Sequence, residues 1–145
     1  MKQILVTAAV IEEWEPAEGG KALKPSRRFL MAQRLPGGAE GGKWEFPGGK
    51  VEPGEEPRQC LARELREELG VTAVAGRILD AVSVATPDRQ LVLLYFKADI
   101  QNGPPMALQC QQVTWFDPVA IDTLDKPMAD RLFWEKNKLS LVTGC

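Results

Sequence analysis

The sequence predicts an α/β fold in which a mixed β-sheet lies between helices. Two observations carry this prediction. Apolar, β-branched segments are interleaved along the chain with two segments of helical periodicity. The length of 145 residues matches one ordinary domain, which can bury a core without a disulfide or a structural metal ion. We therefore expect residues 1–145 to form a single domain.

The strands are predicted from runs of β-branched and aromatic residues bounded by Gly, Pro and charged residues. These runs are residues 4–11, 28–34, 77–86, 90–100 and 111–116, with a short extended piece at 44–49. Residues 14–25 and 35–43 have no periodicity and are expected to be loops. The run Leu91–Phe96 is apolar throughout, which is typical of a strand covered on both faces.

Two helices are predicted. The clearer one is Pro57–Leu69, in which a proline suits the first turn and the following Gly70 suits the helix end. Its apolar stripe consists of Leu61, Leu65 and Leu69. The second covers residues 126–139, with Pro127 near its start.

The composition excludes several chemistries. The chain has no histidine, so a His general base, a Ser-His-Asp triad and a His-ligated zinc ion are impossible. A net charge of −2 gives no basic excess for a nucleic-acid polymer. The odd, widely spaced cysteines Cys60, Cys110 and Cys145 suit a reducing compartment. No apolar run is long enough to cross a membrane, and we expect a cytoplasmic protein.

Three carboxylates gather on one side of the first helix. Glu64, Glu67 and Glu68 fall within an arc of about 100°, beside the leucine stripe. Like charges at this spacing repel by a few tenths of a kcal/mol per pair, so the arrangement favours a bound cation. Oxygen ligands without histidine select a hard ion such as Mg²⁺. The alternative is an ordinary solvated face, because arginines are interspersed at positions 58, 63 and 66.

The residues before this helix favour the metal site. Gly48 and Gly49 bring bare backbone near the helix, where a carbonyl oxygen can serve as a further ligand. Glu55 lies eight residues before Arg63, and an ion pair between them would hold the loop against the helix.

The spacing of these residues resembles a complete Nudix box over residues 49–71. The matching positions are Gly49, Glu55, Arg63-Glu64-Leu65, Glu67-Glu68 and Gly70-Val71. Further segments, among them Trp44–Glu52 and Pro87-Asp88-Arg89, resemble the MutT-like branch of that family. The resemblance implies a Nudix α/β/α sandwich.

The resemblance also implies roles for the residues of the box. Glu67 and Glu68 match the family's metal-binding glutamates, and Glu64 matches a glutamate that binds metal or activates the attacking water. The Gly48 carbonyl matches a backbone metal ligand, while Gly49, Glu55 and Arg63 match structural supports. The implied cofactor is Mg²⁺, with Mn²⁺ as a substitute.

The implied activity is Mg²⁺-dependent hydrolysis of a nucleoside triphosphate to a nucleoside monophosphate and pyrophosphate. An oxidised purine nucleotide such as 8-oxo-dGTP is the favoured substrate. A CTP/dCTP pyrophosphatase and a hydrolase of ADP-ribose are alternatives of the same class. A non-catalytic nucleotide-binding module is an alternative of a different class. The expected partner is a small nucleotide, not a nucleic-acid polymer or a membrane, and the oligomeric state is not predicted.

The substrate-binding residues are predicted less sharply. Arg34, Lys50 and Arg89 are candidates to neutralise phosphate charge, and Phe46 and Phe96 are candidates to flank the base. Asp125 falls where the enzyme for oxidised guanine has an asparagine. One departure concerns a further metal-ligating glutamate found in some members. Gln109 stands at that position, and no acid lies between Gly103 and Phe116, so the number of metal ions is left open.

Overall fold

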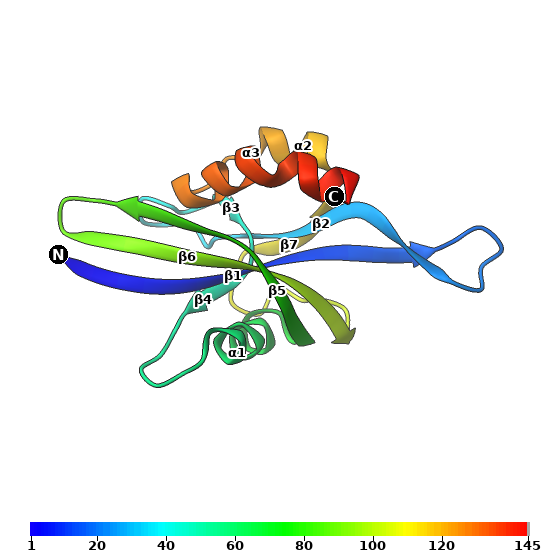
Figure 1. Cartoon of the computed structure of the whole chain (residues 1–145), viewed down its shortest axis with the longest axis horizontal. Helices are drawn as coiled ribbons and strands as arrows, with labels where there is room; N and C mark the ends of the chain where they lie inside the picture. Colours follow the sequence, from blue (N-terminus) through cyan, green and yellow to red (C-terminus); the bar gives the residue numbers. More distant parts are fainter. Residues whose placement is uncertain (145) are drawn as a thin grey trace.

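The computed structural model describes residues 1–144 as a seven-stranded sheet with α1 on one face and α2 and α3 on the other (Figure 1). The strand order is β3-β2-β1-β6-β5, with β4 paired to β1 and β7 paired to β2. β1 and β6 are parallel and the other pairs are antiparallel, which confirms the predicted mixed α/β sheet. The elements are β1 (Lys2–Pro16), β2 (Leu23–Gln33), β3 (Trp44–Glu45), β4 (Gly48–Lys50), α1 (Pro57–Leu69), β5 (Thr72–Ala85), β6 (Arg89–Asn102), β7 (Gln112–Phe116), α2 (Pro118–Thr123) and α3 (Met128–Thr143).

The central strand β1 divides the core into two layers because its side chains alternate between the faces of the sheet. Ala9 and Ile11 pack in the cluster that contains the leucines of α1. Ala8 and Val10 pack in the cluster that contains Phe133 and Trp134 of α3. Each fully buried leucine of α1 contributes about 1.5–3 kcal/mol, so the predicted leucine stripe fixes this helix on the sheet.

α1 has the predicted bounds, and both of its ends are capped. Pro57 occupies the first turn and Gly70 has the left-handed conformation (φ 68°) that ends the helix. The N-cap is Glu56, whose carboxylate accepts the N–H groups of Arg58 and Gln59 at 2.9 and 3.3 Å. These caps hold the start of the acidic face in a fixed position relative to β4.

The prediction of a loop at residues 14–25 is wrong. β1 and β2 continue as a hairpin that projects beyond the rest of the sheet (Figure 1), with Trp14 opposite Pro25 and Pro16 opposite Leu23. Cross-strand ion pairs hold this ribbon, for example Arg28 with Glu13 at 2.6 Å. No helix covers the ribbon, so its side chains are mostly charged and show no alternation of apolar and polar residues.

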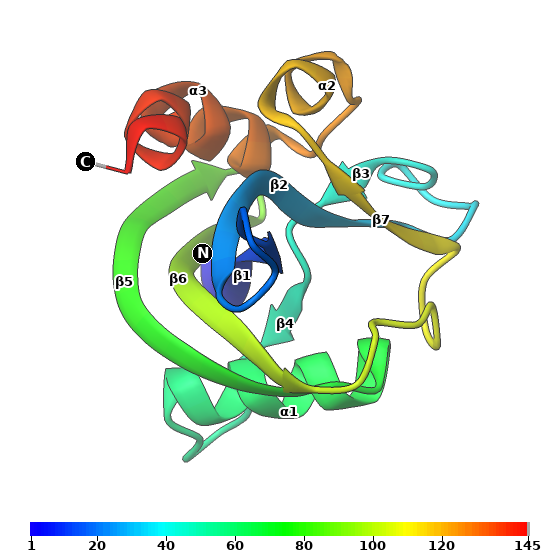
Figure 2. The ribbon, with the colours of Figure 1, turned by 90° about the vertical axis from the view of Figure 1, so that its right-hand side faces the viewer.

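The prediction that Leu91–Phe96 is covered on both faces is also wrong for most of the run. Only Tyr95 and Phe96 are buried, at 0% and 2% exposure, while Leu91 to Leu94 are half-buried. At their hairpin end, β5 and β6 extend past α1 and α3 (Figure 1), so the helices do not cover that part of the two strands. The start of β5 and the end of β6 lie against α1 (Figure 2). β5 begins at Thr72, five residues before the predicted start at Arg77.

The C-terminal part contains a short helix that was not predicted. α2 begins after Asp117, whose carboxylate accepts the N–H of Ala120 at 2.8 Å. α3 begins at Met128, so Lys126 lies outside it. The Lys126 ammonium donates to the carbonyl oxygens of Ile121 and Leu124 at 2.6 and 2.9 Å and thereby caps α2. Within residues 1–144, no helix is both long enough and apolar enough to cross a lipid bilayer.

Candidate active site

The two glycines of β4 bring its backbone against both β1 and α1. A Cβ atom at Gly48 would collide with the carbonyl group of Thr7 in β1. A Cβ atom at Gly49 would instead occupy the space of the Glu64 carboxylate. The first glycine therefore permits the β1–β4 pairing, and the second permits Glu64 to lie directly on the strand.

The carbonyl oxygen of Gly48 is not used by the pairing with β1. The N–H of Ala9 donates to Pro47, and the N–H of Val51 donates to Leu5. Because hydrogen-bonded and non-hydrogen-bonded pairs alternate in an antiparallel ladder, the Gly48–Ala8 pair between them is non-hydrogen-bonded. The Gly48 carbonyl therefore points away from β1, as a backbone metal ligand requires.

Arg63 forms the predicted ion pair with Glu55. Its Nε and Nη2 atoms lie 2.8 and 3.0 Å from the two carboxylate oxygens of Glu55, a bidentate geometry. Nη2 also donates to the Lys50 carbonyl at 3.3 Å, so one guanidinium joins the loop, β4 and α1. Nη1 lies 3.0 Å from Glu64 and 3.3 Å from Glu67, and this orients two of the three helix carboxylates.

Replacing Glu55 with Gln is expected to lower the melting temperature by several degrees at neutral pH, because the loop loses its bidentate attachment to α1. The hydrogen bonds from Arg63 lower the pKa of Glu55 to about 2. The stabilisation is therefore fully present above the unfolded pKa of 4.5 and is lost as the pH falls toward 2. Thermal unfolding of E55Q and wild type between pH 7 and pH 2 measures this, with the exposed Glu52→Gln as the matched control. Equal melting temperatures for E55Q and E52Q at pH 7 would contradict it.

Glu64 and Glu68 form a crowded carboxyl pair. Burial raises the pKa of Glu64, whose side chain is 15% exposed. Burial, followed by the negative charges of Glu64 and Glu45, raises the pKa of Glu68 to about 8. A hydrogen bond between the two carboxyl groups contributes to this shift, and a proton held by Glu68 would offset their repulsion.

The donor set fits a hard divalent cation, although it is not a complete metal cage. Within residues 1–144, no three acidic side chains converge on one point, because Arg63 holds Glu64 and Glu67 while Glu68 turns to Glu64. Mg²⁺ needs only one or two carboxylates and fills its remaining positions with water and substrate phosphate. A cation that replaces the shared proton would relieve the repulsion between Glu64 and Glu68.

This pair predicts an unusual pH dependence for the metal-free protein. An acid whose pKa is raised by folding binds more protons in the folded state than in the unfolded state between the two pKa values. The free energy of unfolding should therefore fall as the pH rises from 4.5 through about 8, by on the order of 2 kcal/mol after allowance for solvent screening.

Urea unfolding in EDTA at pH 6 and pH 8 measures this effect. Glu68→Gln should reduce the difference between the two pH values, and the exposed Glu67→Gln should not. The part that remains in E68Q belongs to Asp130, whose raised pKa of about 7 lies in the same window. A wild-type protein that is equally stable at both pH values would contradict the assignment.

A second polar group joins the predicted Arg34 to two carboxyl groups, Glu45 and Asp130, that the sequence did not single out. Arg34 donates to Glu45 at 2.7 Å, and burial raises the pKa of Glu45. Asp130 of α3 is 3% exposed, accepts the Tyr95 hydroxyl at 2.6 Å and accepts the Phe46 N–H. Burial raises the pKa of Asp130 to about 7. The charge of Glu45 raises the pKa of both Glu68 and Asp130, so this carboxylate lies near both groups.

The structure brings together only some of the predicted substrate-binding residues. Arg34 lies beside Glu45, and the Asp125 carbonyl accepts the N–H of Trp44 in the neighbouring β3. Lys50 is exposed at the end of β4. Arg89 lies opposite Lys2 in the β1–β6 ladder, whereas Lys50 lies opposite Val6, four residues later in β1. Arg89 therefore lies at the β5–β6 hairpin, apart from the carboxylates.

The prediction that Phe46 flanks the base is not compatible with its position. Phe46 is 3% exposed and makes edge contacts with Tyr95 and Phe133, with ring centroids 6.1 and 5.4 Å apart. The ring also lies 6.3 Å from that of Trp134 and belongs to the core layer under α3. Adjacent residues of an extended segment point to opposite sides, so the Phe46 side chain points into the core while that of Glu45 points the other way.

The loop that carries Gln109 is docked on the end of α1. The N–H of Met106 donates to Leu69 at 2.9 Å, and the N–H of Leu108 donates to Glu68 at 3.0 Å. Gln109 therefore follows directly on a contact with the acidic helix. In the same loop, burial and the charges of Glu68 and Glu45 raise the pKa of Cys110, which places this thiol near both carboxylates.

Comparison with known proteins agrees with this geometry. The family model of the NUDIX domain matches residues 21–134. The CTP pyrophosphohydrolase of Escherichia coli K12 is 36% identical over 129 residues, which cover 89% of this chain and 85% of that protein. The 8-oxo-dGTP diphosphatase of the same organism is 35% identical over 88 residues, or 61% of this chain and 68% of that protein. The solution structure of the E. coli ORF135 protein matches with a TM-score of 0.78 and 32% identity, covering 99% of this chain and 94% of that one.

Proposed function

Because the chain belongs to the Nudix family, as a MutT-like hydrolase that acts on phosphoanhydride bonds of nucleotides, we propose that it converts nucleoside triphosphates to nucleoside monophosphates and pyrophosphate with Mg²⁺ as its cofactor. The observation that carries this proposal is the crowded pair Glu64–Glu68, where the pKa of Glu68 is raised to about 8. Such a pair gains stability when a cation binds.

The residues that would hold the ion are Glu64, Glu67, Glu68 and the Gly48 carbonyl. When bound, a divalent cation neutralises charge on phosphate oxygens and lowers the pKa of coordinated water. Mn²⁺ offers the same preference for oxygen ligands and should substitute.

The side chains of this chain supply the positioning and the proton transfer. Arg63 fixes the carboxylates of Glu64 and Glu67 at 3.0 and 3.3 Å, which limits their reorganisation during the reaction. Glu64 is the proposed base, because its desolvated carboxylate can accept a proton from the attacking water. The water oxygen bonds to phosphorus, the bridging phosphoanhydride bond breaks, and the proton goes to Glu64. Lys50 and Arg34 are the proposed cations for phosphate oxygens.

Two bases are candidates for the substrate. Oxidised guanine, as in 8-oxo-dGTP, is the candidate from the sequence. Cytosine is the second candidate because the E. coli CTP pyrophosphohydrolase aligns with most of this chain. With Phe46 in the core, Asp125 is the predicted residue that remains a candidate to contact the base, and its backbone lies beside β3.

A panel of substrates tests the proposal. Release of pyrophosphate and nucleoside monophosphate is measured for CTP, dCTP, dGTP, 8-oxo-dGTP and ADP-ribose, with Mg²⁺, with Mn²⁺ and with EDTA. We expect metal-dependent turnover of at least one triphosphate, with the highest kcat/KM for 8-oxo-dGTP or for a cytosine nucleotide. Turnover of ADP-ribose alone, or equal rates in EDTA, would contradict the proposal.

A further inference from the structure

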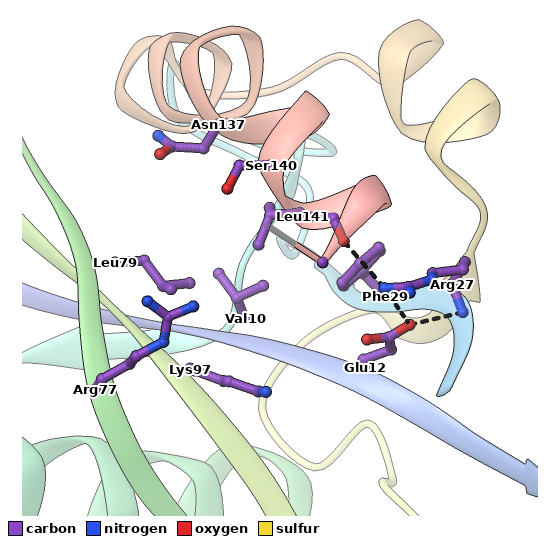
Figure 3. Close-up of a pocket in the computed structure, with 11 residues that line it drawn as sticks. Val10, Glu12, Arg27, Phe29, Arg77, Leu79, Lys97, Asn137, Ser140 and Leu141 are labelled. Carbon is purple, nitrogen blue, oxygen red and sulfur yellow. Dashed lines mark hydrogen bonds and ion pairs between the residues drawn. The ribbon is translucent and has the colours of Figure 1, made fainter. Parts of the chain in front are cut away.

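A separate cleft lies on the face of the sheet opposite α1. It has a volume of about 170 Å³ and is enclosed by the last turns of α3 and by strands β1, β2, β5 and β6 (Figure 3). Val10, Phe29 and Leu79 belong to the core layer under α3, so the sheet separates this cleft from the carboxylates of α1. The cleft also lies at the C-terminal half of α3, whereas Asp130 is in the first turn of that helix.

The charges that line the cleft do not balance. Among the described residues that line it, three cations, Arg27, Arg77 and Lys97, accompany one carboxylate, that of Glu12. Arg27 is already engaged, because it lies 3.9 Å from Glu12 and donates to the Leu141 carbonyl at 3.4 Å, where it neutralises the end of α3. In the described part of the chain neither Arg77 nor Lys97 forms an ion pair, which leaves two positive charges in the cleft.

The backbone departs from regular geometry where it presents these groups. The register of β5 shifts on both sides of Ile78, which redirects the neighbouring Arg77. The register of β1 shifts between Glu12 and Trp14. Arg27 has a φ of 63°, and no other non-glycine residue within 1–144 has a positive φ. The Glu12 carboxylate accepts the N–H of Arg27 at 2.7 Å. Strained and bulged positions of this kind concentrate at ligand sites.

We propose that this cleft is a second anion site, which binds a small phosphate-type dianion between Arg77 and Lys97. A dianion matches the two uncompensated charges, whereas a carboxylate would neutralise only one. Arginine presents a planar fork of donors that suits a phosphate group. The volume is well below the roughly 300 Å³ of typical pockets for larger ligands. The site therefore takes a phosphate group, while any larger part of the molecule stays in solvent.

Free phosphate, pyrophosphate and a phosphomonoester share this chemistry, and a titration distinguishes them. ¹⁵N-labelled full-length protein is titrated in EDTA, at constant ionic strength, with inorganic phosphate, pyrophosphate, CMP or acetate. EDTA keeps divalent cations from recruiting these anions to α1. Inorganic phosphate should cause saturable shifts of the amides of residues 77–79, 97 and 140–141, but not of residues 64–70. If CMP binds more weakly than inorganic phosphate, the site is assigned to free phosphates. If CMP binds more tightly than inorganic phosphate, the site is assigned to phosphomonoesters.

Matched variants decide whether the cleft itself binds the anion. Arg77→Gln and Lys97→Gln should each weaken phosphate binding about fivefold. Both side chains are exposed, so the fold should be retained. Lys21→Gln also removes one positive charge, but at the tip of the β1–β2 hairpin, and should leave the affinity for phosphate unchanged. The proposal is overturned if no saturable shift occurs in the cleft, if acetate binds as tightly as phosphate, or if the Arg77 and Lys97 variants bind like K21Q.

Discussion

Replacing Glu68 with glutamine is expected to lower kcat/KM about a thousandfold while the protein stays folded. Glu68 is the most strongly perturbed carboxyl of the acidic face, with a pKa of about 8. Its amide analogue keeps the shape of the side chain but cannot carry the charge that balances a divalent ion. The loss corresponds to about 4 kcal/mol of transition-state stabilisation. Steady-state kinetics with the best triphosphate of the panel measures it.

The control for E68Q is Glu135→Gln, which removes an exposed carboxylate from α3 and should leave kcat/KM unchanged. In EDTA at pH 8, E68Q should be at least as stable as wild type, because the repulsion with Glu64 is gone. This stability measurement therefore distinguishes an E68Q protein that is folded but inactive from one that is inactive because it is unfolded. Turnover by E68Q within threefold of wild type would contradict its role.

Substituting alanine at Gly48 and at Gly49 is expected to give two different defects. The added Cβ of Gly48→Ala meets the backbone of Thr7, which cannot move without breaking the β1–β4 pairing. We expect a loss of about 3 kcal/mol and a fall of about 6–12 °C in the melting temperature. The Cβ of Gly49→Ala meets the Glu64 carboxylate, a flexible group that can move aside. This variant should lose about 1 kcal/mol or less but about a hundredfold in kcat.

Thermal unfolding and kinetics of the two variants test this contrast. Gly76→Ala in β5 is the control, because its Cβ would lie 3.2 Å from the Lys97 carbonyl, outside the acidic face. Gly76→Ala should lower the free energy of unfolding slightly and leave kcat unchanged. If G49A were as active as G76A, Glu64 would not depend on close contact with β4.

The parts of the fold that were predictable from the sequence are those in which local signals agree. Pro57, the leucine stripe and Gly70 indicate the same helix, and its observed bounds are the predicted ones. The Glu55–Arg63 ion pair was predictable because the two residues are eight positions apart, a distance that one loop and two helical turns can close. Short-range geometry determines both features, so one sequence was enough.

The features that were missed depend on partners distant in the chain. The ribbon around Trp14 and Pro25 is stabilised by pairing between strands and not by burial, so it left no apolar pattern. Leu91 looks like a core residue, but the helices do not extend over it. The Tyr95–Asp130 hydrogen bond joins residues 35 positions apart. For α2, the N-cap Asp117 followed by Pro118 is a usable signal that the sequence analysis did not apply.

The acidic face of α1 and the Gly48 carbonyl form the proposed metal site. Anomalous diffraction from crystals soaked with Mn²⁺ and a non-hydrolysable nucleotide analogue locates the ion. We expect an anomalous peak within coordination distance of Glu67 or Glu68, with the polyphosphate bound to the same ion. A peak elsewhere, or a bound analogue with no ion beside these glutamates, would contradict this assignment.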